Sequence, residues 1–256
     1  MSTAVFRPNT VGWFEITTAE PELAEQFYRS LFDWRFTAFD SEYHTITAPD
    51  AAVATGALRR GGRDALCISV ICDDLTATIP RLEALGATVV EPPARTPAGD
   101  LHAIVTDAQG NRIGLFAPAA QRNSAPGPQP PTPNSLAWFE IGTTDFAASR
   151  KFYEQAFGWR YERDEAAEGV AYYNILVEGA SEPIGGMVDL SAGPTPTDYA
   201  IPGLLVADVP DLLERCERAG GQRVMGPFPD GNGLIIGQFT DRFGNRWSSF
   251  ARPADG

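Results

Sequence analysis

The sequence has little lysine, histidine or cysteine and no long apolar run. Of its 20 basic residues, 19 are arginine and only Lys151 is lysine, against 33 acidic residues, so the 256-residue chain carries a formal charge of −13. Such a chain lacks the basic surface that binds nucleic acid or anionic membranes. No apolar run reaches the roughly 18 residues of a membrane span, and residues 1–9 lack the features of a secretory signal. We therefore expect a cytoplasmic protein with neither nucleic acid nor a membrane as partner.

The three cysteines, Cys67, Cys72 and Cys216, are too few for a disulfide framework, and their spacing is not that of a zinc site. We expect them to be small buried core residues, as free cysteines usually are. What the chain does contain is an ordinary globular balance, with 43% apolar and 11% aromatic residues. Its length suits one large domain or two domains of about 100–130 residues.

The chain is an internal duplication. Shifted by 125 positions, Val11–Phe36 aligns with Leu136–Tyr161 and is identical at 10 of 26 positions, including Trp-Phe-Glu-Ile and Phe-Tyr-x-x-x-Phe-x-Trp. Shifted by 134, Val105–Ala117 aligns with Phe239–Ala251 at 7 of 13 positions, including Thr-Asp-x-x-Gly-Asn-Arg. Between the copies, Ala119–Asn134 contains five prolines and no large apolar residue, which is typical of an extended linker. We predict an N-terminal domain at 1–118, a linker at 119–134 and a C-terminal domain at 135–256.

Within the first copy, the periodicity predicts two strand–helix–three-strand (βαβββ) modules. Alternation over Val11–Thr17 predicts a strand, and the apolar spacing in Glu20–Leu31, with Pro21 near its start, predicts a helix. The remaining expected elements are strands at Arg35–Phe39, Tyr43–Ala48, Val53–Leu58 and Leu66–Ile71, a helix at Leu75–Leu85, and strands at Thr88–Val90, Leu101–Val105 and Arg112–Phe116. The fold class is therefore α+β, with four such modules in the whole chain.

These motifs resemble the vicinal oxygen chelate superfamily, which includes glyoxalase I, bleomycin-resistance proteins and extradiol dioxygenases. The resemblance is carried by Phe27–Trp34 and Phe152–Trp159 and by the turns Asp107–Asn111 and Asp241–Asn245, and within the superfamily it is nearest to tandem-domain actinobacterial members. It implies two glyoxalase-like domains whose curved, mostly antiparallel sheets form cups. It says little about the reaction, because one fold hosts many chemistries.

In that superfamily a divalent metal ion usually lies at the base of the cup, held by histidine and carboxylate side chains. The resemblance places the ligand positions at Trp13 and Trp138 on the first strands, near Cys67 and Ile201 in the second modules, and at Gly114 and Ser248 on the last strands. None of these residues supplies a strong nitrogen or oxygen ligand. We therefore expect a protein with no metal and no other cofactor.

Glu15 and Glu140 are the leading candidates for chemistry in place of the metal. If the first strands face the cup as in the superfamily, each carboxylate points into it beside Trp13 or Trp138, where burial favours an acid–base role. The competing interpretation is structural, with these carboxylates paired to arginines such as Arg112 and Arg246.

Two histidines are also candidates. His102 is the preferred general base if the first domain is catalytic, because its strand forms a wall of the cup, whereas His44 lies in a short alternating strand. Both could equally satisfy a structural hydrogen bond. Trp34 and Trp159, which follow the helices, are expected in the core. Phe116 and Phe250 lie on the same face as the missing ligand and could line a cleft for a flat apolar molecule. The predicted substrate contacts are Trp13, Phe116, Trp138, Ser248 and Phe250.

Three functions are consistent with this pattern. The preferred one is a metal-independent enzyme of specialised metabolism that rearranges, cyclises or dehydrates an aromatic or polycyclic small molecule. The second is a non-catalytic protein that sequesters a toxic drug. The third is a metal-dependent lyase or dioxygenase with unconventional ligands such as Glu15, His102 and Glu140. The sequence also leaves open whether the chain forms a homodimer.

Overall fold

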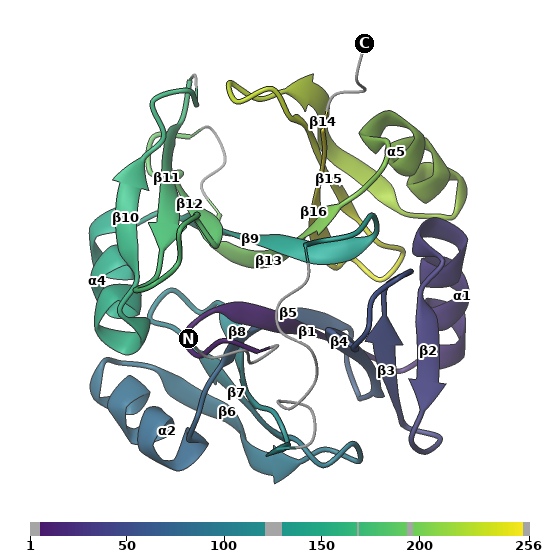
Figure 1. The fold of residues 1–256 in the computed structure, drawn as a ribbon, viewed down its shortest axis with the longest axis horizontal. Coiled ribbons are helices and arrows are strands. Elements are labelled where there is room, and N and C mark those ends of the chain that lie inside the picture. The colour runs from purple at the N-terminus through teal and green to yellow at the C-terminus, as the bar shows by residue number, and fades with distance from the viewer. Residues whose placement is uncertain (1–5, 121–129, 168, 194–196, 253–256) are drawn as a thin grey trace. The chain divides into compact units, whose positions relative to one another are not determined.

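The computed structural model describes residues 6–120, 130–167, 169–193 and 197–252 (Figure 1). Residues 121–129, most of the predicted linker, lie outside the described part. The elements of the first half are β1 (Val11–Thr18), α1 (Pro21–Phe32), β2 (Arg35–Ala38), β3 (Tyr43–Thr47), β4 (Gly56–Arg60), β5 (Ala65–Ile71), α2 (Leu75–Ala84), β6 (Thr88–Arg95), β7 (Leu101–Thr106) and β8 (Arg112–Ala117). The predicted βαβββ order is confirmed.

The second half repeats this order. Its elements are β9 (Ser135–Thr143), α4 (Phe146–Phe157), β10 (Arg160–Arg163), β11 (Ala171–Leu176), β12 (Gly185–Asp189), β13 (Tyr199–Leu205), α5 (Val209–Arg218), β14 (Gln222–Pro229), β15 (Ile235–Thr240) and β16 (Arg246–Ala251). Among the described residues, no helix is long and apolar enough to cross a bilayer.

Local sequence explains where the helices begin. Helix α1 has Pro21 at its first position. A backbone N–H at this position would have no partner within the helix, so proline costs no hydrogen bond there. Helices α2, α4 and α5 begin after aspartates whose carboxylates accept backbone N–H groups of the first turn: Asp74, Asp145 and Asp208. Strand β6 runs beyond the predicted Thr88–Val90 through Pro92 and Pro93, because it is an edge strand, where prolines without N–H groups are tolerated.

Each half forms one eight-stranded sheet. The strand order is β2-β3-β4-β1-β5-β8-β7-β6 in the first sheet and β10-β11-β12-β9-β13-β16-β15-β14 in the second. The pairs β1–β4, β5–β8, β9–β12 and β13–β16 are parallel. In each module, the three strands that follow the helix pair antiparallel with one another, as β2, β3 and β4 do. The predicted α+β class with mostly antiparallel sheets is confirmed.

The described residues group into two compact units, and each unit takes one module from each half of the sequence. Of the described residues, unit 1 contains 6–13, 67–120, 138–167, 169–193 and 197–200, and unit 2 contains 14–66, 130–137 and 201–252. The start of β1 thus belongs to unit 1 and the rest of it to unit 2. Each compact unit therefore combines modules from different halves of the sequence, whereas each sheet is formed by the strands of one half.

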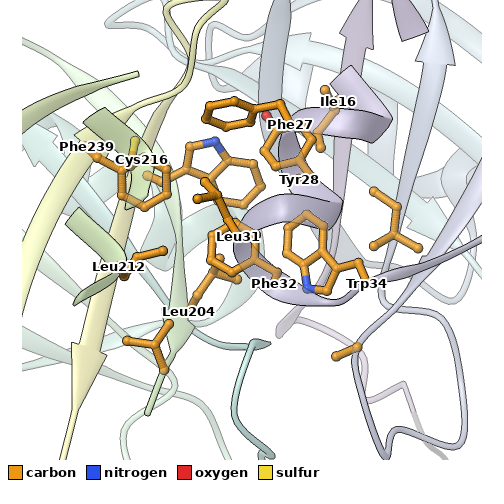
Figure 2. Close-up of a cluster of buried hydrophobic side chains, with 14 of the residues drawn as sticks. Ile16, Phe27, Tyr28, Leu31, Phe32, Trp34, Leu204, Leu212, Cys216 and Phe239 are labelled. Carbon is orange, nitrogen blue, oxygen red and sulfur yellow. The ribbon is translucent and has the colours of Figure 1, made fainter. Parts of the chain in front are cut away.

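In unit 2, helix α1 packs against the last module of the chain. The residues of this core that Figure 2 labels are Ile16, Phe27, Tyr28, Leu31, Phe32, Trp34, Leu204, Leu212, Cys216 and Phe239. Trp34 is 1% exposed, as predicted for a core residue, and Phe14 of β1 packs edge-on against Trp247 at 5.4 Å between ring centroids. Burying one such ring contributes about 1.5–3 kcal/mol to folding.

The repeated motifs join the two halves of the sequence within each unit. In unit 2 the hydroxyl of Tyr28 donates to a carboxylate oxygen of Asp241, and the same oxygen accepts from the side-chain amide of Asn245 at 2.8 Å. In unit 1 Tyr153 donates to Asp107 in the same way, at 2.7 Å. The tyrosine of Phe-Tyr in one half is thus bonded to the Asp-x-x-Gly-Asn turn of the other.

The tryptophans that end the same motif make a second equivalent link. The indole N–H of Trp34 donates to the carbonyl oxygen of Asn134, and that of Trp159 donates to the carbonyl oxygen of Asn9, both at 2.7 Å. Asn9 and Asn134 are equivalent residues just before β1 and β9, and both have positive φ angles, of 62° and 67°. The motif residues that carry the family resemblance therefore hold the two halves of the sequence together within each unit.

Two glycines leave room for the phenylalanine of the Trp-Phe-Glu-Ile repeat. A Cβ atom added at Gly56 of β4 would lie 2.4 Å from the ring of Phe14, and one at Gly185 of β12 would lie 2.3 Å from the ring of Phe139. Gly185 and its neighbour Gly186 begin strand β12, where an aromatic ring occupies the space of each missing side chain.

Gly56→Ala and Gly185→Ala should each lower the free energy of unfolding by about 1–3 kcal/mol, because an extra methyl group overpacks the core. Chemical denaturation monitored by circular dichroism measures this change. Gly62→Ala is the matched control, since a Cβ atom there would meet nothing within 4 Å. Equal stability of all three variants would contradict the packing described.

Candidate functional site

In each sheet, alternate side chains pack with the helices and the others point to the opposite, helix-free face. Phe14 and Ile16 belong to the core that contains α1, so Glu15 lies on the helix-free face of the first sheet. Phe139 and Ile141 belong to the core that contains α4, so Glu140 lies on the helix-free face of the second sheet. Both carboxylates therefore lie on the face of their sheet that is opposite to the helices.

In unit 1, the helix-free face of the first sheet is filled by its own side chains. Trp13 stacks on Phe116 with ring centroids 4.4 Å apart and 12° between the planes, and both side chains are 0% exposed. His102 is opposite Phe116 in the β7–β8 pair, and its Nε2 lies 3.4 Å from the hydroxyl oxygen of Ser69. His102 and Ser69 are both buried.

Glu15, in unit 2, forms an ion pair. Its carboxylate is 2% exposed and accepts from Nε of Arg59 at 3.0 Å. Arg112, the partner considered from the sequence, instead pairs with Glu91 at 3.1 Å. Because Arg59 compensates its charge, Glu15 fits the structural interpretation with a different arginine.

His44 lies on the helix-bearing side of the first sheet. Its Nδ1 is 3.0 Å from a carboxylate oxygen of Glu25, which belongs to α1. His44 therefore satisfies a structural hydrogen bond, as one of the two interpretations of the sequence expected.

The helix-free face of the second sheet in unit 1 combines a carboxylate with three aromatic residues, and all four side chains are half-buried. The hydroxyl of Tyr199 on β13 donates to Oε1 of Glu140 at 2.5 Å. The indole N–H of Trp138 donates to the hydroxyl oxygen of Tyr172 on β11 at 3.1 Å. We call Trp138, Glu140, Tyr172 and Tyr199 the tyrosine–glutamate site.

Two glycines make space for the tyrosines of this site. A Cβ atom at Gly186 would lie 1.9 Å from the hydroxyl oxygen of Tyr172, and one at Gly142 would lie 2.2 Å from the ring of Tyr199. Any larger residue at either position would displace a ring. The sequence pointed to Trp138 and Glu140 but missed Tyr199, which has Ala65 as its counterpart at the start of the equivalent strand β5.

Ser248 and Phe250, two further predicted contacts, lie on the helix-free face of the second sheet in unit 2, because Trp247 and Ala251, which alternate with them along β16, belong to the core. In the β15–β16 pair, Ser248 is opposite Gln238 and Phe250 is opposite Ile236. Both are half-buried. Arg246, at the start of this strand, donates from Nε to the side-chain oxygen of Gln238 at 2.9 Å.

The ligand positions implied by the resemblance do not suit a metal ion. Trp13 places an apolar ring at one of these positions. Another of them is Gly114, where an added Cβ atom would lie 2.0 Å from the hydroxyl oxygen of Ser69. In the part of the chain that the structure describes, no three His, Cys, Asp or Glu side chains gather where they could hold a metal ion. The three cysteines are free and buried, as predicted.

Two family models match the chain, one in each half. Residues 135–248 match the "Glyoxalase/Bleomycin resistance protein/Dioxygenase superfamily" model, and residues 13–116 match the "Glyoxalase-like domain" model. The chain belongs to the glyoxalase/bleomycin resistance protein/dioxygenase superfamily. Its two eight-stranded, unclosed sheets are glyoxalase-like domains, as the resemblance implied.

Two curated proteins illustrate what the chain is similar to. A "Putative glyoxylase CFP32" from Mycobacterium tuberculosis is 25% identical over 232 residues, which are 87% of each chain. The "Anthracycline biosynthesis protein DnrV" from Streptomyces peucetius is 29% identical over 106 residues, which are 37% of this chain and 38% of that protein.

Solved structures share the glyoxalase fold at low sequence identity. The Mn(II)-bound glyoxalase from Novosphingobium aromaticivorans has a TM-score of 0.67 and 15% identity, over 96% of this chain and 82% of that chain. The 2,3-dioxygenase LapB from Pseudomonas sp. KL28 has a TM-score of 0.63 and 17% identity, over 98% of this chain and 93% of that chain. At these identities the likeness concerns the fold alone.

Proposed function

We propose that this glyoxalase-superfamily protein binds a flat aromatic small molecule at the tyrosine–glutamate site and transfers protons there through Glu140, without a metal ion. One observation carries the proposal: the Glu140 carboxylate is held by the hydroxyl of Tyr199 at 2.5 Å, on a face that also carries Trp138 and Tyr172. A positioned carboxylate beside aromatic rings combines an acid–base group with a surface on which a flat ligand can stack.

Each residue of the site has a role in this proposal. Trp138 and Tyr172 offer ring surfaces to the ligand, and the bond between them fixes the orientation of both rings. Tyr199 positions the carboxylate of Glu140, which removes a proton from a C–H or O–H group of the ligand. Returning that proton to another atom completes a rearrangement or cyclisation, and returning it to a departing hydroxyl group completes a dehydration. None of these reactions consumes an oxidant or a reductant.

The substrate class rests on the rings of the site and on one relative. DnrV is named for anthracycline biosynthesis, and it matches about a third of this chain. An aromatic or polycyclic metabolite of a comparable pathway suits a site with three aromatic side chains and one carboxylate. Because the positions implied for metal ligands in this sheet hold Trp138, Ile201 and Ser248, none of which is a strong metal ligand, no step of the proposed reaction passes through a metal ion.

A time course by mass spectrometry tests this function. The purified protein is incubated with a panel of aromatic and polycyclic metabolites, and we expect at least one to be converted to an isomer or to a product lighter by one water. Tight binding by calorimetry with every compound recovered unchanged would identify a drug-sequestering protein instead. Conversion that incorporates molecular oxygen would contradict proton-transfer chemistry.

A further inference from the structure

We propose that a cavity beside the first two turns of helix α2, in unit 1, binds a small zwitterionic amino acid (Figure 1). The cavity has a volume of about 280 Å³, near the lower limit for small-molecule pockets. Its lining comes from the chain before β1 and from the start of α2, and includes Pro8, Asn9, Cys72, Asp73, Thr78 and Arg81. Because α2 packs on the side of the first sheet opposite to the helix-free face, the inference goes beyond the proposed function.

The cavity carries one negative and one positive side chain. Asp73 and Arg81 both line it, and both residues are exposed. Burial raises the pKa of the Cys72 thiol to about 12, and the nearby Arg81 and Asp73 act on it in opposite directions. Two opposite charges therefore lie around one buried thiol, which stays protonated at neutral pH and offers a hydrogen-bonding group rather than a nucleophile.

The second copy of the repeat shows what is particular to Arg81. Shifted by 134 positions, Arg81 corresponds to Arg215 of α5, and Ala77 corresponds to Asp211. Nε of Arg215 donates to Asp211 at 2.7 Å, and its Nη1 donates to the carbonyl oxygen of Leu31 at 2.8 Å. Because Arg81 has an alanine in place of that aspartate, no carboxylate lies one turn before it on the helix. Its guanidinium group can accept the carboxylate of a ligand instead.

The buried part of the lining differs between the copies as well. Cys72 and Thr78, which are 4% and 7% exposed, line the cavity with a thiol and a hydroxyl group. Their counterparts in the second copy are Val206 and Leu212, two apolar residues of the unit 2 core. The copy that has the cavity thus has polar groups where the other copy has apolar side chains, and these groups suit a polar ligand side chain.

The charges around the cavity define the ligand class. The carboxylate of Asp74 accepts the backbone N–H groups of Thr76 at 2.8 Å and Ala77 at 3.4 Å. The groups with which a helix end usually binds an anion are therefore occupied. A zwitterion meets an opposite charge at each end, because its ammonium group can donate to Asp73 and its carboxylate can accept from Arg81. L-Serine, whose hydroxyl adds a polar side chain, is the simplest probe.

Isothermal titration calorimetry of the whole chain with L-serine tests the inference, and we expect a single saturable site. Ethanolamine lacks the carboxylate of serine and glycerate lacks its ammonium group. Each should bind at least about tenfold more weakly, because one charge-assisted hydrogen bond is lost. In nitrogen-15 NMR spectra, the backbone amide resonances of Asn9 and Ala77, which both line the cavity, should shift as serine saturates the site.

Two variants reproduce features of the second copy. Ala77→Asp gives Arg81 the internal partner that Arg215 has, and Asp73→Ala introduces the alanine found at the equivalent position of the second copy. Each should weaken serine binding about tenfold to a hundredfold. Both positions are exposed, so the denaturation midpoint should stay at the wild-type value. Arg63→Ala, which removes an exposed arginine outside the cavity, is the matched control and should bind as the wild type does.

Three results would overturn the inference. The first is the absence of saturable serine binding, and the second is wild-type affinity in both Ala77→Asp and Asp73→Ala. The third is binding of ethanolamine or glycerate as tight as that of serine, which would identify a site for a single charge. Glu140→Gln should leave serine affinity unchanged, because Glu140 lies on the other sheet. A failure of this proposal and a failure of the proposed function can therefore be told apart.

Discussion

Glu140→Gln should lower the turnover number for the aromatic substrate by about 100- to 10,000-fold, the range expected when a positioned acid–base group is removed. Glutamine keeps the size of the side chain and can still accept a hydrogen bond from Tyr199, so substrate affinity should change little. Steady-state kinetics and calorimetric binding, measured on the same preparation, separate the two effects. A variant that turns over at the wild-type rate would remove Glu140 from the chemistry.

The duplication supplies a matched control for this experiment. Glu15→Gln makes the same change in the same Trp-Phe-Glu-Ile repeat, but Glu15 is paired with Arg59. We expect Glu15→Gln to lower stability, because it leaves a charged guanidinium group without its partner, and to keep turnover within a few-fold of the wild type. The difference in turnover between Glu140→Gln and Glu15→Gln assigns the catalytic site to one of the two repeats.

Tyr199→Phe tests the positioning role of the tyrosine. The charged form of Glu140 loses a hydrogen bond in this variant, so the acidic limb of the pH–rate profile should move to higher pH. A purely structural tyrosine would lower stability and leave that limb where it is in the wild type.

Tyr28→Phe and Tyr153→Phe should each lower the free energy of unfolding by about 1–3 kcal/mol, because a buried carboxylate loses a hydrogen bond. Tyr28 is fully buried, and burial together with the neighbouring Asp241 raises its pKa well above the usual value. Burial also raises the pKa of Asp241, while the bonds from Tyr28 and Asn245 lower it. The tyrosine hydroxyl is thus one of the groups that make an ionised carboxylate tolerable at this depth.

The two tyrosine variants belong to different compact units, so their effects should add in the double variant to about 2–6 kcal/mol. Chemical denaturation measures the sum. Tyr173→Phe is the control, since its half-buried ring stacks on Phe146 at 4.1 Å and this stacking survives the change. If Tyr28→Phe and Tyr153→Phe are as stable as Tyr173→Phe, the motif tyrosines do not stabilise the packing between the two halves of the sequence.

Much of the fold follows from local pattern. The positions of α1 and α2, and of most strands, are set by apolar periodicity, by Pro21 and by aspartate caps, all of which can be read along the chain. The duplicated motifs also indicated the family. What the pattern could not show is that Tyr28 reaches Asp241, 213 residues away, and that Tyr153 reaches Asp107. Such contacts depend on which module packs against which, and alternation within one strand contains no information about that.

The candidate site was predictable only in part. Alternation placed Glu15 and Glu140 on the same kind of face, but their environments depend on neighbouring strands. In the β1–β4 pair Arg59 reaches Glu15, whereas the equivalent register position in the β9–β12 pair is Val188, and Tyr199 approaches Glu140 from β13. A comparison of the two halves, position by position, would have revealed the change from arginine to valine. It would not have identified Tyr199 as the partner.

The metal content of the purified protein tests the central claim most directly, namely that the residues at the implied ligand positions have replaced metal chemistry. Inductively coupled plasma mass spectrometry, combined with turnover before and after EDTA treatment, gives the result. We expect far less than one manganese, iron or zinc ion per chain, and turnover that EDTA does not change. One ion per chain, with activity lost on EDTA treatment and restored by that ion, would contradict the account.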